Sequence, residues 1–287
     1  MTVKSVLRTM PYSLIRDTHL YYELAGRGPA VLMLHGIGSN SRSFRHQVAA
    51  LADRYTCIAW DAPGYARSDD PPRAFTMDDL ADYAVGLLDH LAIPRAHVLG
   101  TSLGGVIAQA LYHRHPERVR SLLLADTNPG SGSLPEPERS RRVQARLDAL
   151  ATQTPRQIAE ARAPHVVSPN APATLVHEVA DIMAEIRPLG YRAAAIAMGT
   201  TDLSQQLPRI SVPALILVGE LDTVTPPATA ELLARAIPNA RLVVIPGAGH
   251  LSHQEQPEVF NAAVRAFLDE VESAAAATTS SVSRAIE

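Results

Sequence analysis

Ser102 stands in a motif that can turn a serine hydroxyl into a nucleophile. Residues 100–104 have the sequence Gly-Thr-Ser-Leu-Gly, between an apolar run typical of a buried strand (96–99) and one typical of a helix (106–111). A sharp turn from strand to helix strains its central residue, and small residues on either side leave room for it. Nearby amides and the helix N-terminus supply positive potential for an oxyanion. The motif therefore predicts an activated hydroxyl at Ser102.

Asp222 and His250 follow Ser102 along the chain, and each lies in the loop after an apolar run that predicts a buried parallel strand. A serine hydroxyl is a poor nucleophile at neutral pH, so a base must take its proton. An imidazole can do this, and a carboxylate on its other nitrogen fixes the tautomer and the orientation of the ring. We therefore expect Ser102, Asp222 and His250 to form a catalytic triad.

Three other polar residues lie near these motifs. Asp126 follows an apolar strand and is the alternative acid, but Asp222 is preferred because it follows the next long strand and begins a loop that leads into a helix. His35 is expected to brace its loop, because His250 already supplies the base. His253 is expected on the next helix, at the surface or behind the site. No cysteine cluster or His-rich metal motif occurs, so we expect no metal.

The elements that must position these residues alternate between strand and helix patterns up to about residue 130 and again after 207. This alternation implies right-handed crossovers and a mostly parallel sheet, with functional residues at the carboxyl ends of the strands. Two N-terminal extended segments are expected near 5–9 and 12–25. Thr76 and Asp79 predict the start of one helix through a capping box.

The alternation breaks between residues 128 and 207, where prolines and glycines mark a boundary. Helices are expected there near 136–151, 155–162, 172–186 and 189–198. We interpret this segment as a helical cap inserted after the sixth strand, which would exclude water and shape the pocket. A second lobe without a catalytic part is the alternative. The predicted division is a core at 1–130 and 208–271, a cap at 131–207 and a flexible tail at 272–287.

Composition limits the kinds of partner. A chain of 287 residues that is 46% hydrophobic can bury one large core. Its net charge is −3 with interspersed signs, so nothing predicts a nucleic-acid or membrane partner, and no apolar run has the length of a membrane span or a signal peptide. Cys57, the single cysteine, lies in a strand pattern and is expected to be buried. We expect a cytoplasmic enzyme that acts on a small molecule. The sequence leaves the oligomeric state open, and a homo-oligomer is one of the alternatives.

These motifs, in this order, resemble the α/β-hydrolase superfamily, and within it the 3-oxoadipate enol-lactonases and small carboxylesterases. Residues 54–68, 100–105 and 249–258 carry the closer resemblance. It implies the α/β-hydrolase fold, with a mostly parallel eight-stranded sheet flanked by helices and a helical cap after strand 6. It also implies a serine hydrolase of the EC 3.1.1 type, which needs no cofactor and cleaves a small carboxylic ester or enol-lactone through an acyl-enzyme.

The resemblance also assigns residues that bind. The main-chain amides of Ile37 and Leu103 are expected to hold the oxyanion, and Gly36 to contact the substrate. An enol-lactone with a free carboxylate needs a cationic partner, for which arginine is suited. Residues 188–192, Pro-Leu-Gly-Tyr-Arg, resemble the cap exit of the lactonases. Arg192 is therefore chosen among the eight arginines of the cap.

Two other functions stay open. Hydrolases of C–C bonds in meta-cleavage dienoates share the superfamily motifs, but they often have an aromatic residue after the catalytic histidine and a G-S-G-P-G-like oxyanion loop. This chain has Leu251 and, at 37–39, Ile-Gly-Ser instead. A non-catalytic ligand-binding homologue, such as a hormone receptor, can also retain a triad. Perhydrolysis, the reaction of the cofactor-free haloperoxidases, also stays open as a side activity of this chain.

Overall fold

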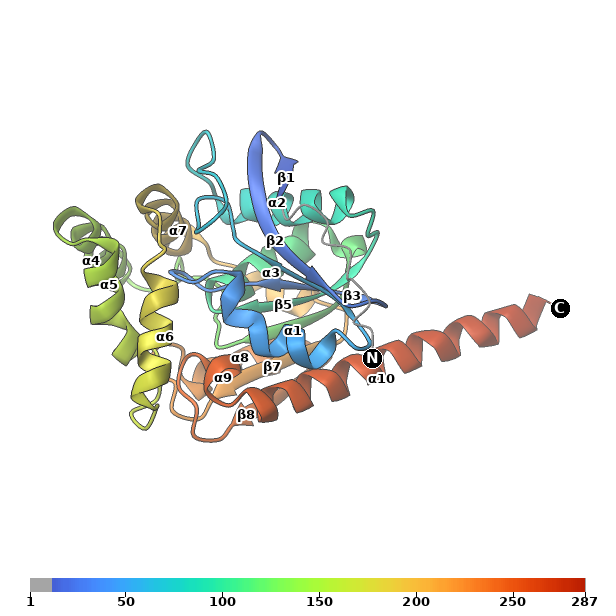
Figure 1. Cartoon of the computed structure of the whole chain (residues 1–287). Helices are drawn as coiled ribbons and strands as arrows, with labels where there is room; N and C mark the ends of the chain where they lie inside the picture. The colour runs from blue at the N-terminus through green and yellow to red at the C-terminus, as the bar shows by residue number, and fades with distance from the viewer. Residues whose placement is uncertain (1–11, 287) are drawn as a thin grey trace, which may run out of the picture.

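The computed structural model describes residues 12–286 and contains an eight-stranded sheet (Figure 1). The strand order is β1-β2-β4-β3-β5-β6-β7-β8; β2 is antiparallel to both of its neighbours, and all other neighbouring pairs are parallel. The predicted mostly parallel sheet is therefore confirmed. The strands are β1 Tyr12–Ile15, β2 Thr18–Ala25, β3 Ala30–Leu34, β4 Thr56–Trp60, β5 Ala96–Thr101, β6 Val119–Ala125, β7 Ala214–Gly219 and β8 Ala240–Ile245.

The N-terminal extended segments differ from the prediction in detail. The stretch expected at 12–25 is a hairpin of β1 and β2, because Arg16 and Asp17 take positive φ values of 48° and 65° and reverse the chain. The segment expected near 5–9 lies outside the described residues.

Helices cover both faces of the sheet (Figure 1). In β3, Val31 and Met33 face one apolar cluster and Leu32 and Leu34 face another, as the two-residue period of a strand requires. Residues of α1 (Arg45–Leu51) and α10 (Pro257–Ile286) belong to the first cluster. Residues of α2 (Met77–His90), α3 (Leu103–Arg114) and α8 (Pro227–Ala236) belong to the second.

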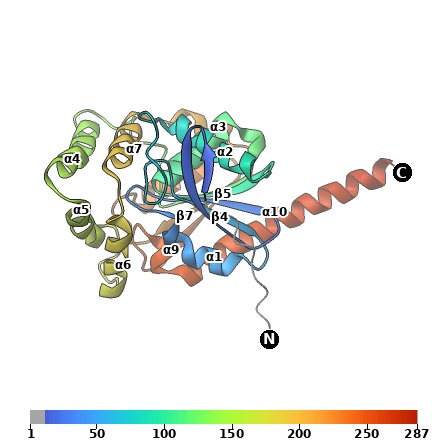
Figure 2. The same ribbon diagram turned by 45° about the horizontal axis from the view of Figure 1, so that its top comes forward.

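The segment between β6 and β7 folds into four helices that lie together at one end of the sheet (Figures 1 and 2). They are α4 Glu138–Thr152, α5 Pro155–Arg162, α6 Ala173–Met183 and α7 Pro188–Thr200. The remaining helix is α9 Ser252–Glu255, and short 3-10 turns lie at Ser41–Phe44, Pro116–Arg118, Ala163–His165 and Ser204–Arg209. The helices of the inserted segment begin and end within a few residues of the predicted positions.

The cap is fixed to the core by ion pairs and by close backbone contacts. The ion pairs are Arg42–Glu185, Arg45–Glu178 and Arg187–Asp70. At the start of α7, a Cβ added to Gly190 would lie 1.9 Å from the carbonyl oxygen of Gly64, so only glycine permits this approach. The contact sets how far the cap stands from the turn at Gly64.

Residues 272–286 belong to the segment that we expected to be a flexible tail. In the structure α10 continues as a helix through Ile286. Alanine-rich segments favour helix over coil, and Glu272 anchors this part of α10 because its carboxylate accepts hydrogen bonds from Arg120 at 2.7 Å and 2.8 Å. None of the helices in the described part of the chain is both long and apolar enough to span a membrane.

We predict that Gly190→Ala destabilises the folded protein, because the new methyl group would collide with the backbone at Gly64. Overpacking of this kind costs about 1–3 kcal/mol, which thermal unfolding would show as a lower Tm. Gly199→Ala on the same helix is the matched control, because its methyl group would meet the side chain of Val143, which can move. Equal Tm values for the two variants would contradict the close contact.

Candidate active site

Ser102 occupies a strained turn between β5 and α3. Its φ and ψ are 52° and −116°, a conformation that side chains rarely adopt. The turn is possible because its glycines have no side chain: a Cβ on Gly100 would lie 2.2 Å from the carbonyl oxygen of Gly104. Its position is further held by hydrogen bonds, from Ser102 N–H to the Ala125 carbonyl at 2.9 Å and from the Thr127 hydroxyl to the Ser102 carbonyl at 2.6 Å. The hydroxyl therefore projects beyond the end of β5.

Ser102, His250 and Asp222 are joined by a continuous chain of hydrogen bonds. The Ser102 Oγ lies 3.0 Å from His250 Nε2, and His250 Nδ1 lies 2.9 Å from Asp222 Oδ2. His250 and Asp222 are buried. Ser102 follows β5, Asp222 follows β7 and His250 follows β8, so three parallel strands bring their carboxyl ends to one edge of the sheet. The structure thus brings together the three residues that the sequence predicts as a triad.

Asp222 is held in its ionised form by several donors. Its Oδ1 accepts from the backbone amides of Val224 and Thr225 at 2.7 Å and 2.9 Å, and its Oδ2 accepts from the Thr225 hydroxyl at 2.8 Å. Burial alone would raise the pKa of Asp222, but the hydrogen bond and charge of His250 and the bonds from Thr225 outweigh it, so its pKa is lower than usual. An ionised Asp222 fixes the proton of His250 on Nδ1 and leaves Nε2 free to face Ser102.

Asp126, the alternative acid, binds other groups. Its Oδ1 accepts from the Gly219 amide at 2.9 Å, and its Oδ2 accepts from the amide and hydroxyl of Ser252 at 3.1 Å and 2.6 Å. Burial raises the pKa of Asp126 to about 7, although the potential of His250 lowers it. Asp126 therefore links the end of β6 to the end of β7 and to Ser252, which lies two positions after His250.

The loop after β3 brings backbone donors next to Ser102. A Cβ added to Gly36 would lie 3.2 Å from the Ser102 Cβ, and Gly36 and Ile37 both line the cavity at Ser102. The amides of Ile37 and Leu103 donate no hydrogen bond to any residue that the structure describes. Both amides therefore have no acceptor among the described residues, which the oxyanion role predicted for them requires.

His35 braces this loop, as expected. It is buried, its Nε2 accepts from the Ala62 amide at 3.0 Å, and its Nδ1 lies 2.9 Å from the Gly36 carbonyl. Because Nε2 accepts, Nδ1 carries the proton and donates it to that carbonyl. Burial lowers the pKa of His35 and favours this neutral form.

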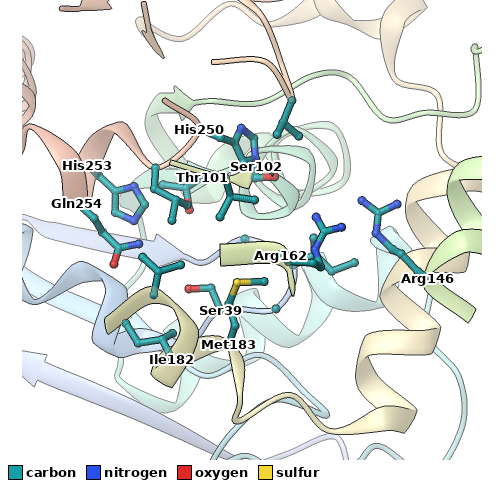
Figure 3. A pocket seen from close by; sticks show the side chains of 17 residues that line it. Ser39, Thr101, Ser102, Arg146, Arg162, Ile182, Met183, His250, His253 and Gln254 are labelled. Carbon is teal, nitrogen blue, oxygen red and sulfur yellow. Dashed lines mark hydrogen bonds between the residues drawn. The ribbon is translucent and has the colours of Figure 1, made fainter. Parts of the chain in front are cut away.

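A cavity with about 590 Å³ of empty space, a volume that includes its open mouth, lies over Ser102 and His250 (Figure 3). Much of its lining is apolar and comes from the cap and the neighbouring loops. These side chains are Val166, Val179, Ile182, Met183, Val224 and Leu251. The cap therefore forms a wall of the cavity that contains the Ser102 hydroxyl.

Arg192, which we predicted to bind substrate, is not part of this cavity. It is exposed on α7 and lines a separate hollow with Pro71 and Leu189. Arg146 and Arg162 line the Ser102 cavity instead (Figure 3). Both were among the cap arginines visible in the sequence, but the sequence alone does not show which helix face turns toward Ser102.

His253 and Gln254 also line the cavity, so His253 does not lie at the surface. The His253 ring is 1% exposed, packs against Phe44 and Phe260, and has no hydrogen-bond partner on either nitrogen among the described residues. Burial lowers its pKa to about 3, so the ring is neutral. No sequence signal shows that both residues face the cavity, because their place within four positions of His250 does not reveal how α9 is oriented.

Comparison with known proteins places the chain in a family. A family model described as the alpha/beta hydrolase fold matches residues 29–257, and the chain belongs to this family. It is 32% identical to 3-oxoadipate enol-lactonase 2 of Acinetobacter baylyi, over 88% of this chain and 94% of that protein. It is 33% identical to the pimeloyl-[acyl-carrier protein] methyl ester esterase of Chromobacterium violaceum, over 83% of this chain and 94% of that protein.

Solved structures agree with this assignment. An esterase from Thermogutta terrifontis superposes with a TM-score of 0.81 at 32% identity, over 88% of this chain and 94% of that one. The enol-lactonase from Burkholderia xenovorans gives a TM-score of 0.83 at 28% identity, over 90% of this chain and all of that one. The chain is therefore a hydrolase of the α/β-hydrolase fold, close to enol-lactonase-like members.

We predict that Asp126 makes the folded protein less stable as pH rises from about 4 to 7. Its pKa is about 7 in the folded protein, against 3.8 for an ordinary aspartate. Between these two pKa values the Asp126 carboxyl is still protonated in the folded protein but is ionised in the unfolded chain. Rising pH therefore favours unfolding. As pH rises from 4.5 to 7.5, the Tm of Asp126→Asn should therefore increase relative to the Tm of the wild type. Parallel Tm curves for the two proteins would contradict the raised pKa.

Proposed function

We propose that this chain is a serine hydrolase that cleaves a small carboxylic ester or lactone through an acyl-enzyme. Ser102 acts as the nucleophile, His250 as the general base and Asp222 as its carboxylate partner. The observation that carries the proposal is the hydrogen-bonded chain from the Ser102 hydroxyl through His250 to Asp222, which opens into a small apolar cavity. The relatives named esterase and enol-lactonase support the same bond type.

Acylation begins when His250 Nε2 takes the proton of Ser102 and the serine oxygen attacks the carbonyl carbon. Negative charge develops on the carbonyl oxygen, and the amides of Ile37 and Leu103 stabilise it by about 3 kcal/mol each. The imidazolium of His250 is stabilised by Asp222 and then protonates the leaving alkoxide or enolate. The products of this half-reaction are an ester on Ser102 and a free alcohol or enol; a lactone stays attached as one molecule.

Deacylation reverses these roles with water. His250 removes a proton from a water molecule, the hydroxide attacks the acyl carbon, and the Ser102 oxygen leaves with the proton that His250 returns. These steps use only protein groups and water, so the proposal includes no cofactor. The cap helices wall the cavity and would restrict the entry of bulk water.

We also propose a cytoplasmic location and a small-molecule partner. Cys57 is a buried free thiol in β4, which is compatible with a reducing compartment. The cavity over Ser102 has a mostly apolar lining with a few polar side chains, which is the kind of lining that small-molecule sites have.

We predict that Ser102→Ala lowers kcat for p-nitrophenyl acetate or butyrate by about 10³-fold or more, because only the oxyanion amides and substrate binding remain. Asp222→Asn should lower kcat by about 10⁴-fold through the wrong histidine tautomer. Steady-state kinetics on folded variants would measure both effects.

Asp126→Asn is the matched control for the acid, because this buried carboxylate binds Ser252 and Gly219 rather than His250. Its loss of kcat should be much smaller than that of Asp222→Asn. A larger loss of kcat in Asp126→Asn than in Asp222→Asn would assign the role of the triad acid to Asp126. A folded Ser102→Ala variant that retains a tenth of the wild-type kcat would exclude Ser102 as the nucleophile, and turnover of a dienoate but no ester would favour a C–C bond hydrolase.

A further inference from the structure

The eight arginines of the cap differ in how their charge is compensated. Four of them form ion pairs with carboxylates at 2.6–2.7 Å: Arg139 with Glu136, Arg142 with Glu138, Arg156 with Asp181 and Arg187 with Asp70. Arg146 and Arg162, the two that line the Ser102 cavity, form no ion pair with any residue that the structure describes. Arg141 and Arg192 also lack an ion pair among the described residues, but both are exposed to solvent. Arg146 and Arg162 are therefore the two unpaired cap arginines that are partly buried, and both face the cavity.

Arg146 lies on α4 and is largely enclosed. Its Nη1 donates to the Arg142 carbonyl at 3.1 Å, while its Nε is buried without a hydrogen-bond partner in the described part of the chain. Burial lowers the pKa of Arg146, and the positive charge of Arg162 lowers it further. The neighbouring tyrosines Tyr65 and Tyr191 oppose this shift only in part. A buried donor without an acceptor is costly, and an anion bound beside Arg146 would remove this cost.

Arg162 ends α5, and its side chain makes no hydrogen bond or ion pair with any residue between 12 and 286. Figure 3 shows its guanidinium group on the same side of the cavity as that of Arg146, opposite His253 and Gln254, with Ser102 and His250 between the two sides. Two like charges that approach each other in a partly apolar cavity repel, and an anion placed between them would relieve both the repulsion and the unpaired donors.

We propose that Arg146 and Arg162 bind a carboxylate of the substrate, so that the hydrolase acts on esters or lactones that carry a free carboxylate. This inference rests on the proposed function of Ser102. The guanidinium fork matches a carboxylate with two parallel hydrogen bonds, and the apolar lining suits a short hydrocarbon segment between that carboxylate and the reacting carbonyl. Half-esters of short dicarboxylic acids and carboxylate-bearing lactones have this form.

The test compares substrates that differ only in the carboxylate. For the acyl side, the p-nitrophenyl monoester of glutaric acid is compared with p-nitrophenyl pentanoate, in which a methyl group replaces the carboxylate. For the alcohol side, 4-carboxyphenyl acetate is compared with phenyl acetate. We expect the wild type to prefer the charged member of at least one pair by about tenfold or more in kcat/KM.

Arg162→Gln and Arg146→Gln should each reduce this preference severalfold, mainly through a higher KM for the charged ester. Arg162→Lys should keep part of it, because lysine retains the charge but not the fork. Arg156→Gln is the matched control on the same helix as Arg162, because Arg156 pairs with Asp181 and is exposed; it should leave the preference unchanged. Circular dichroism and Tm values would establish that each variant is folded.

Inhibition by glutarate gives a second readout that needs no charged substrate. Glutarate should compete with p-nitrophenyl acetate in the wild type, and its inhibition constant should rise at least about tenfold in Arg162→Gln. Equal kcat/KM within both substrate pairs, or a preference that both arginine variants retain, would overturn the carboxylate site. Absence of turnover for every ester would instead overturn the proposed function, so the two failures are distinguishable.

Discussion

At the turn between β5 and α3, the carbonyl oxygen of Leu34 lies 1.8 Å from the place where a Cβ of residue 104 would stand. This approach presses the start of α3 against the end of β3, and it requires glycine at position 104. Because β3 and α3 are held so closely, the loop at Gly36 lies beside Ser102, and Ile37 lines the same cavity as Ser102. The close approach at Gly104 therefore places the loop after β3 next to the strained turn at Ser102.

Two buried carboxylates near Ser102 differ in their protonation because their hydrogen-bond partners differ. Asp222 faces a histidine that can become positive, and its pKa is lowered; Asp126 faces neutral donors, and its pKa is raised. Both carboxylates are tied to the loop after β8, Asp222 through His250 and Asp126 through Ser252. In the proposed mechanism Asp222 stabilises charge on the imidazole, while Asp126 fixes the backbone that carries the imidazole.

The sequence was sufficient for the features that depend on local patterns. The strand at 119–125 and the helix that Thr76 and Asp79 cap are found where they were predicted, and both hydrogen bonds of that capping box are present. The fold and the hydrogen-bonded chain were predicted from the glycines around Ser102 and from the order of Ser102, Asp222 and His250. This was possible because a backbone approach that only glycine permits fixes the residue type at that position.

Features that depend on how helices turn against the core could not be predicted. Arg192 and Arg162 have the same chemistry, and only the packing of α5 and α7 decides that Arg162 faces Ser102 while Arg192 faces solvent. His253 was expected outside or behind the site for the same reason, since a position after His250 does not reveal the orientation of α9. The hairpin at Arg16 and Asp17 needs positive φ values at two residues that do not favour them, so no turn signal marked it.

Covalent labelling shows whether Ser102 is an activated nucleophile. The wild type and His250→Ala would each be treated with diisopropyl fluorophosphate, digested and examined by mass spectrometry. We expect one phosphoryl adduct, on the peptide that contains Ser102, formed rapidly in the wild type and at a greatly reduced rate in His250→Ala. Labelling of another serine, or equal labelling rates of Ser102 with and without His250, would contradict it.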